Sequence, residues 1–166
     1  MSDPIRSAIS HIRSVYAELE NLREVRNCTA RTTCCRFGIT GKTPMLTAGE
    51  ALVAAAGVRA SGRKSLVEAD HPDGRCPLLG EDGGCTIYDS RPFGCRTHFC
   101  QAAGGQIHRS LVKQQIRALE EIAESLGDTD VRPIAAAISD AMEKLPKRSR
   151  QKLPRKSGGT RPSPKR

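Results

Sequence analysis

The sequence of 166 residues has no tryptophan, three phenylalanines and two tyrosines, so aromatic residues make up only 3% of it and apolar residues 37%. So few large apolar side chains give a thin core, which metal ions or covalent cross-links can reinforce. No segment approaches the ~18 consecutive apolar residues of a membrane-spanning helix, so we expect no membrane partner. The N-terminal segment carries charges but no apolar block. We therefore expect no secretory leader and a cytoplasmic location, where thiols stay reduced.

The formal charge of +9 is concentrated at the C-terminal end. Ten of the 27 basic residues and no acidic residue lie between Lys144 and Arg166, whereas residues 1–143 hold 17 basic and 18 acidic residues. We therefore divide the chain into a domain at residues 1–145 and a basic tail at residues 146–166, which we expect to be disordered. Two roles remain open for the tail: weak attraction to nucleic acid or another polyanion, or solubilisation alone.

Seven cysteines are the most specific feature of the chain, and four of them fall in the 25 residues from Cys76 to Cys100. Thiolates at such short intervals, separated by glycine and proline turns, can converge on one metal ion or cluster. Disulfides and inert buried thiols are the alternatives, but seven cysteines cannot all pair within one chain. The candidate metal ligands are Cys28, Cys34, Cys35, Cys76, Cys85, Cys95 and Cys100. The last four of these, from Cys76 onward, are expected to supply most of the coordination.

Apolar residues recur at three- and four-residue steps in residues 3–25, 108–126 and 130–145, which predicts three amphipathic helices. We expect the first to begin at Asp3-Pro4 and to pack over the cysteine core. A fourth helix is predicted to start at the capping box Thr47–Glu50 and to end at Gly57. Gly127 should stop the second amphipathic helix, and Pro133 should lie in the first turn of the last.

The segments between these helices are predicted to be irregular, apart from one hairpin. Residues 26–43 are interpreted as a loop, and residues 58–75 as a connector without assigned structure. Residues 76–88 read as a short hairpin that closes through Gly80–Gly84 and brings Cys76 and Cys85 together. Cys95 and Cys100 follow on a helical turn or loop. The expected fold is mainly α, a small helical domain around an irregular cysteine-rich metal-binding core with a short β-hairpin.

With these residues laid out, the chain resembles the YkgJ-type cysteine-cluster family, whose CxxCxxCC domains are regarded as zinc or iron chelators. The resemblance covers residues 28–100, including the helix start at residues 47–50. It rests mainly on an ordered series of short motifs: Cys76-Pro77-Leu78-Leu79, Cys85-Thr86-Ile87-Tyr88, Arg91-Pro92, Cys95-Arg96 and Cys100. The resemblance implies metal chelation rather than a defined reaction.

The first family motif is incomplete in this sequence. In Cys28-Thr29-Ala30-Arg31-Thr32-Thr33-Cys34-Cys35, an arginine stands where the family has its second cysteine. Seven thiolates suffice for one four-thiolate centre but not for two, so we expect one principal centre. Either the missing position is dispensable, or another side chain completes the shell; His98 is the nearest candidate and His71 another. Both histidines can equally be surface or packing residues.

The chemistry of the centre is left open between two functional classes. One is a structural or metal-handling module for zinc or iron, and the other is an iron–sulfur protein with a redox or enzyme-accessory role. Four thiolates satisfy both tetrahedral Zn²⁺ and a four-iron cluster. We find no Ser-His-Asp, phosphate-loop or dinucleotide motif, so a non-enzymatic protein is favoured. Arg91 and Arg96 are expected either to donate to thiolates or to pair with Asp89 or Glu81, and Tyr88 is interpreted as a core aromatic.

Overall fold

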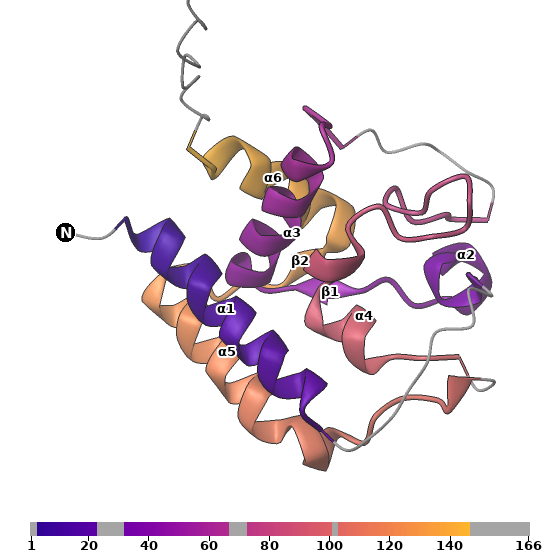
Figure 1. Ribbon diagram of the computed structural model, residues 1–166, viewed down its shortest axis with the longest axis horizontal. Coiled ribbons are helices and arrows are strands. Elements are labelled where there is room, and N and C mark those ends of the chain that lie inside the picture. The colour runs from indigo at the N-terminus through magenta and orange to yellow at the C-terminus, as the bar shows by residue number, and fades with distance from the viewer. Residues whose placement is uncertain (1–2, 23–31, 67–72, 101–102, 147–166) are drawn as a thin grey trace, which may run out of the picture.

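The computed structural model describes residues 3–22, 32–66, 73–100 and 103–146 (Figure 1). The predictions on Cys28, Arg31, His71 and residues 147–166 lie outside these ranges. Helices dominate the described chain, as predicted. Its helices and strands are α1 (Pro4–Glu20), α2 (Phe37–Thr40), β1 (Met45–Leu46), α3 (Ala48–Ala60), α4 (Phe93–Thr97), α5 (Lys113–Ser125), β2 (Arg132–Pro133) and α6 (Ile134–Lys144), with 3-10 turns at Thr33–Cys35, Tyr88–Ser90 and Arg109–Val112.

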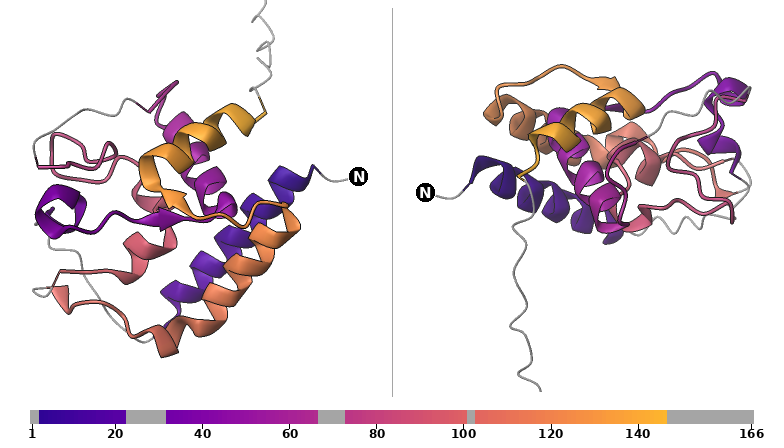
Figure 2. Two further views of the ribbon diagram at one scale, coloured as in Figure 1. Left: turned by 180° about the vertical axis from the view of Figure 1, so that it is seen from behind. Right: turned by 90° about the horizontal axis from the view of Figure 1, so that it is seen from above.

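The four longer helices form the body of the molecule, and the cysteine-bearing segments gather beside it. Helices α1 and α5 lie side by side, and α3 packs against α1, α5 and α6 (Figures 1 and 2). Helix α2, the loops that follow α3 and helix α4 lie on the side away from the start of α1. None of the described helices is long and apolar enough to cross a membrane.

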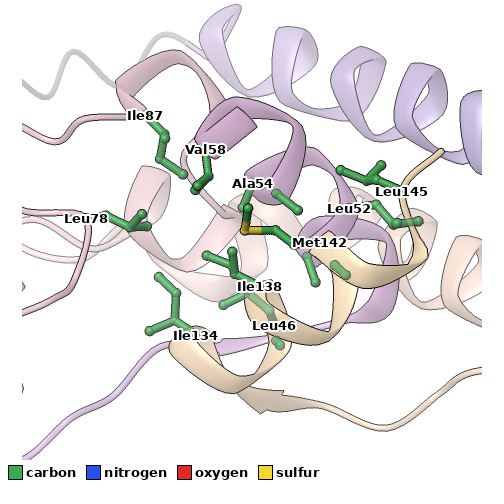
Figure 3. Packing of buried hydrophobic residues seen from close by; sticks show 14 of the residues in the cluster. Leu46, Leu52, Ala54, Val58, Leu78, Ile87, Ile134, Ile138, Met142 and Leu145 are labelled. Atoms are coloured by element: carbon green, nitrogen blue, oxygen red, sulfur yellow. The ribbon is translucent and has the colours of Figure 1, made fainter. Parts of the chain in front are cut away.

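The main core lies between α3 and α6. Aromatic residues are scarce, and the core is built instead from alanines and aliphatic side chains that pack closely. Small side chains on both helices let the two backbones approach closely, while Val58, Ile138 and Met142 fill the space between them (Figure 3). Leu78 and Ile87, from the cysteine-rich segment, are buried in the same cluster. Burying each contributes about 1.5–3 kcal/mol, so the helical body anchors that segment.

The helix boundaries confirm several predicted signals and correct others. The Asp3 side chain caps α1 by accepting a hydrogen bond from the Ile5 N–H at 3.1 Å, but the helix ends at Glu20 rather than near residue 25. Gly127, with φ of 69°, follows the end of α5 as predicted. The last helix starts later than expected, because Pro133 is its N-cap and pairs with Met45 in the antiparallel two-stranded sheet of β1 and β2.

Two expectations about packing are also corrected. Helix α1 packs mainly on α3 and α5, through a cluster that includes Ile12, Val53 and Leu119, rather than over the cysteines. The part of residues 26–43 that the structure describes is not a simple loop, because it folds into the 3-10 turn Thr33–Cys35 and the single-turn helix α2. Such short turns lack the apolar periodicity from which longer helices are recognised.

The prediction that Gly57 ends its helix is wrong, because α3 continues to Ala60. Gly57 instead lies where the 3-10 turn Tyr88–Ser90 contacts the helix. A Cβ atom at position 57 would stand 2.7 Å from the Ser90 Cβ and 2.9 Å from its hydroxyl oxygen. This glycine is therefore explained by close approach of the cysteine-rich segment to α3.

We expect Gly57→Ala to destabilise the protein by about 1–2 kcal/mol, although alanine is the better helix former. The added methyl group would overlap Ser90 and push the turn away from α3. Gly94→Ala is the matched control, because it also lies inside a helix but has no atom within 4 Å of its ideal Cβ position. Denaturant unfolding of both variants measures the difference. A Gly57→Ala protein as stable as the Gly94→Ala protein would contradict this account.

Candidate metal centre

The predicted hairpin brings Cys76 and Cys85 together. Leu79 and Cys85 form an antiparallel bridge, and the Thr86 N–H donates to the Leu78 carbonyl at 2.8 Å. The glycine-rich connection closes through the Gly80 N–H, which donates to the Gly84 carbonyl at 2.7 Å. This short turn places the two cysteines on the same small structural unit, as the sequence predicted.

Backbone hydrogen bonds of the hairpin act on these two thiols. Backbone hydrogen bonding by Leu78 and Leu79 lowers the pKa of Cys76, and that by Ile87 lowers the pKa of Cys85, against the larger effect of burial. The Leu79 N–H also donates to the Cys76 carbonyl at 3.0 Å. Hydrogen bonds of this kind favour the thiolate over the thiol and so counteract burial. They also fix the direction of each sulfur, as the outer hydrogen bonds of metal sites do.

The first cysteine segment docks on the second through a close contact between two glycines. An ideal Cβ on Gly74, where φ is +59°, would lie 2.4 Å from the Gly38 nitrogen, and one on Gly38 would lie 2.7 Å from the Asp73 carbonyl. The backbones are joined by hydrogen bonds from Phe37 N–H to Gly74 O (2.9 Å) and from Gly38 N–H to Asp73 O (3.0 Å). Only glycine permits so close an approach, which carries the preceding cysteines toward Cys76.

Further bonds continue this docking up to the cysteines themselves. The Cys76 N–H donates to the Cys35 carbonyl at 2.7 Å. The thiols of the two residues also interact electrostatically. Arg36 forms an ion pair with Asp73 across the same contact. The structure thus joins residues 33–38 to residues 73–76, although no periodic pattern in the sequence relates them.

The third cysteine-bearing unit is helix α4, which holds Cys95, with Cys100 in the loop after it. Thr97 is buried, and its hydroxyl donates to the Phe93 carbonyl at 3.0 Å within the helix. The Cys100 carbonyl accepts hydrogen bonds from the N–H groups of Ala103 and Gly105, at 2.9 and 3.0 Å. These bonds confirm the predicted helical turn and loop.

All six cysteines that the structure describes line one open cavity of about 400 Å³: Cys34, Cys35, Cys76, Cys85, Cys95 and Cys100. All six are free thiols. His98 lines the same cavity, as do the apolar side chains of Phe37 and Ile134 and the cationic side chains of Lys42 and Arg91. The cavity is much larger than a single metal ion and is bordered by segments far apart in the sequence.

Within this set, four thiols each interact electrostatically with the other three: Cys34, Cys76, Cys85 and Cys95. Cys35 interacts with three of them, Cys34, Cys76 and Cys95. Burial raises the pKa of Cys76 to about 11 and that of Cys95 to about 12, and neighbouring thiols add to both shifts. Burial also raises the pKa of Cys85. Clustered thiols resist deprotonation because each new thiolate repels the next. A bound cation would remove that repulsion, since the ligand form of cysteine is the thiolate.

The adjacent side chains of Cys34 and Cys35 interact with each other. Their sulfurs lie 3.9 Å apart. The hydrogen bond with Cys35 is the main cause that lowers the pKa of Cys34 to about 6, and the same bond is the largest cause that raises the pKa of Cys35. Of the two thiols, Cys34 is therefore the one that loses its proton more easily.

The two arginines near the cysteines have separate functions. The positive charge of Arg91 lowers the pKa of Cys34, Cys85 and Cys95, and its guanidinium lies 3.6 Å from the centre of the Tyr88 ring. Tyr88 is 49% exposed, so its interpretation as a core aromatic is wrong. The Tyr88 ring lies at the cavity wall, where it stacks with the Arg91 guanidinium instead of packing in the core.

Arg96 serves the scaffold rather than the thiols. Its guanidinium donates to the carbonyl oxygens of Asp89 and Arg91, pairs with Glu20 at 3.2 Å and lies 4.3 Å from the centre of the Tyr16 ring. The guanidinium bonds the Asp89 backbone, and its ion pair is with Glu20 rather than with Asp89 or Glu81. Arg96 thus connects α1, through Glu20, with the turn that carries Arg91.

The side chains that line the cavity have the right chemistry for a thiophilic metal. Their sulfurs, however, do not yet surround a common point. Several cysteine sulfurs, backbone hydrogen bonds to them and a nearby guanidinium are what a negatively charged thiolate centre requires. In the ranges described, no three side chains of His, Cys, Asp or Glu already lie together as a metal-ligand group. Binding would therefore require movement that brings several sulfurs to a common point.

Sequence reasoning did not assign the residues that bring the three units together. Gly38 lies in the segment interpreted as a loop, Gly74 lies in the connector without assigned structure, and Glu50 was assigned only to the capping box. One usable signal was present, since neither glycine ends a predicted helix or lies in a predicted hairpin turn. Such glycines often mark a close backbone approach.

A family model, CxxCxxCC, described as "Putative zinc- or iron-chelating domain", matches residues 26–124. This range includes all seven cysteines and extends through most of α5. No curated protein and no solved structure matches the chain.

Proposed function

Because the chain belongs to the CxxCxxCC family, we propose that it binds one zinc or iron centre through Cys34, Cys76, Cys85 and Cys95. The observation that carries this proposal is the mutual interaction of these four thiols at the wall of one cavity. Four thiolates complete a tetrahedral zinc site or hold a four-iron cluster. Cys35 and Cys100 border the same cavity, and Cys28, outside the described residues, remains a candidate for additional coordination.

The metal would act mainly as an organiser of the cysteine-rich half. The four proposed ligands lie on three short segments: the hairpin, the Cys34–Cys35 turn and α4. An ion bound by thiols from all three would cross-link these segments. Such a cross-link stabilises the folded state because the assembled site exists only there. A metal-binding module, structural or metal-handling, is therefore the proposed function, without a catalytic step.

An iron–sulfur cluster with a redox or enzyme-accessory role is the second candidate. It is favoured by the space beside the thiols, since about 400 Å³ exceeds what a lone ion needs. Apolar side chains such as Phe37 and Ile134 and the charge of Arg91 would then set the surroundings of the cluster. His98 is the available non-thiolate ligand in the cavity.

Elemental analysis of the full chain, purified without oxygen from cells supplied with both metals, tests the proposal. We expect about one zinc per chain in a colourless protein, or several irons with broad visible absorption if a cluster is bound. Folded protein that contains no metal and has every thiol free to react would contradict both candidates. Zinc without colour would exclude the cluster under these conditions.

Metal binding is expected to strengthen as the pH rises. The pKa values of Cys76 and Cys95 are about 11 and about 12, and that of Cys85 is also raised, so all three carry protons at neutral pH. Each must lose its proton to become a ligand, and each proton released adds roughly tenfold in apparent affinity per pH unit. Competition with a chelator of known affinity between about pH 6 and 8 measures this slope. A pH-independent affinity would show that these three thiols are not ligands.

A further inference from the structure

Glu50 makes more contacts than a helix cap requires. In the capping box at the start of α3, its Oε2 accepts a hydrogen bond from the Thr47 N–H at 3.0 Å, and the Glu50 N–H donates to the Thr47 hydroxyl oxygen at 3.4 Å. The same Oε2 also accepts a bond from the Thr47 hydroxyl at 2.9 Å. A capping glutamate normally lies in solvent, but this residue is only 4% exposed. Burial raises its pKa, so keeping a carboxyl group there is costly unless it serves further partners.

The second carboxylate oxygen reaches α4, the helix that carries Cys95. Glu50 Oε1 accepts a hydrogen bond from the Phe93 N–H at 2.9 Å, across 43 residues of sequence. Phe93 is the first residue of α4, and its N-cap, Pro92, makes no side-chain capping bond. One carboxylate therefore holds the starts of two helices, and Cys95 lies two residues beyond the bond.

The surroundings of this carboxylate connect it to the thiols rather than to solvent. The buried Tyr16 ring has Glu50, Arg96 and Cys95 among its electrostatic neighbours. Cys95 itself interacts with Cys34, Cys76 and Cys85. The Glu50–Phe93 bond is thus a buried polar tie between the helical body and α4, the α-helix that carries Cys95. A second polar tie is the ion pair of Arg96 with Glu20, whose carboxylate is largely exposed.

We propose that Glu50 is a positioning residue for the metal centre, which holds α4 so that Cys95 can join the other three thiolates. This inference rests on the proposed function, because it assigns a role toward the same metal. Glu50 acts through the Phe93 N–H and touches no ligand itself. Its loss should weaken metal binding by displacing Cys95, whereas loss of the cap alone should weaken only α3.

Cobalt(II) is the probe for the test, because its thiolate charge-transfer and ligand-field bands report the number and arrangement of bound sulfurs. We expect Glu50→Ala to raise the cobalt dissociation constant about tenfold or more and to reduce the charge-transfer intensity. The matched control is Thr47→Val, which removes the capping hydroxyl but leaves Glu50 and its bond to Phe93 in place. This control should bind cobalt with unchanged affinity and spectrum despite a lower melting temperature.

A double-mutant cycle locates the effect at Cys95. In a Cys95→Ser background, Glu50→Ala should cause less than about a twofold further loss in cobalt affinity, whereas in a Cys100→Ser background its full effect should remain. If Glu50→Ala does not fold, Glu50→Asp takes its place, because the shorter acid keeps the charge but cannot reach Thr47 and Phe93 together. It should shift affinity and spectrum in the same direction.

The outcomes separate this inference from the proposed function. Wild-type protein that binds neither cobalt nor zinc would overturn both. Wild-type binding together with equal affinities and spectra for the Glu50 and Thr47 variants would overturn the positioning role alone. An undiminished effect of the Glu50 substitution in the Cys95→Ser background would also overturn it.

Discussion

Gly74→Ala is expected to destabilise the protein by about 2–4 kcal/mol and to weaken metal binding at the same time. A side chain at φ of +59° costs about 1–2 kcal/mol, and an added Cβ at 2.4 Å from the Gly38 nitrogen adds a backbone overlap that no rotamer relieves. Relief requires that residues 37–38 move away from residues 73–74. That movement would separate the Cys34–Cys35 turn from Cys76 and so break the set of four thiols.

Gly41→Ala is the control for the backbone conformation. Its φ of +63° is nearly the same, but nothing lies within 4 Å of its ideal Cβ. This variant should lose only about 1 kcal/mol and keep its metal affinity. Denaturant unfolding and zinc competition on both variants give the two quantities. Equal losses for the two would mean that the Gly38–Gly74 contact has no role in assembling the site.

Cys76→Ala is expected to reduce zinc affinity by about 100-fold or more. Structural zinc sites gain roughly 10–16 kcal/mol from four ligands, so the loss of one costs several kcal/mol, and each 1.4 kcal/mol is a factor of ten. Cys76 is expected to matter most because it is the most buried of the described cysteines and interacts with Cys34, Cys85 and Cys95. In the metal-free protein the same substitution should cost only about 1 kcal/mol of packing.

Cys100→Ala is the comparison within the same cavity. Cys100 lines the cavity but follows α4 in a loop, and we place it outside the group of four ligands. Its loss should change zinc affinity less than tenfold, in contrast with the loss of Cys76. A larger effect of Cys100→Ala would mean that Cys100, rather than Cys34, is the fourth ligand. The spacing of the last four cysteines predicts that arrangement.

Sequence analysis anticipated the local elements well and their boundaries less well. The capping residue Asp3, the capping box at Thr47 and the stop at Gly127 act as predicted, because each depends on hydrogen bonds or dihedral angles within a few residues. Gly57 and Pro133 were assigned to the wrong roles. Their conformations are decided by Ser90 and by the pairing of β1 with β2, contacts that the local sequence does not contain.

By itself, the sequence determined the chemistry of this protein: a mainly helical chain with seven cysteines, few aromatic residues and a family motif that implies zinc or iron. Residue type and short spacing are enough for those conclusions, since thiol chemistry and helix capping are local properties. The tertiary structure decided which thiols meet. The Gly38–Gly74 contact and the Glu50–Phe93 bond join segments 36 and 43 residues apart, and such close approaches arise from packing of the whole chain.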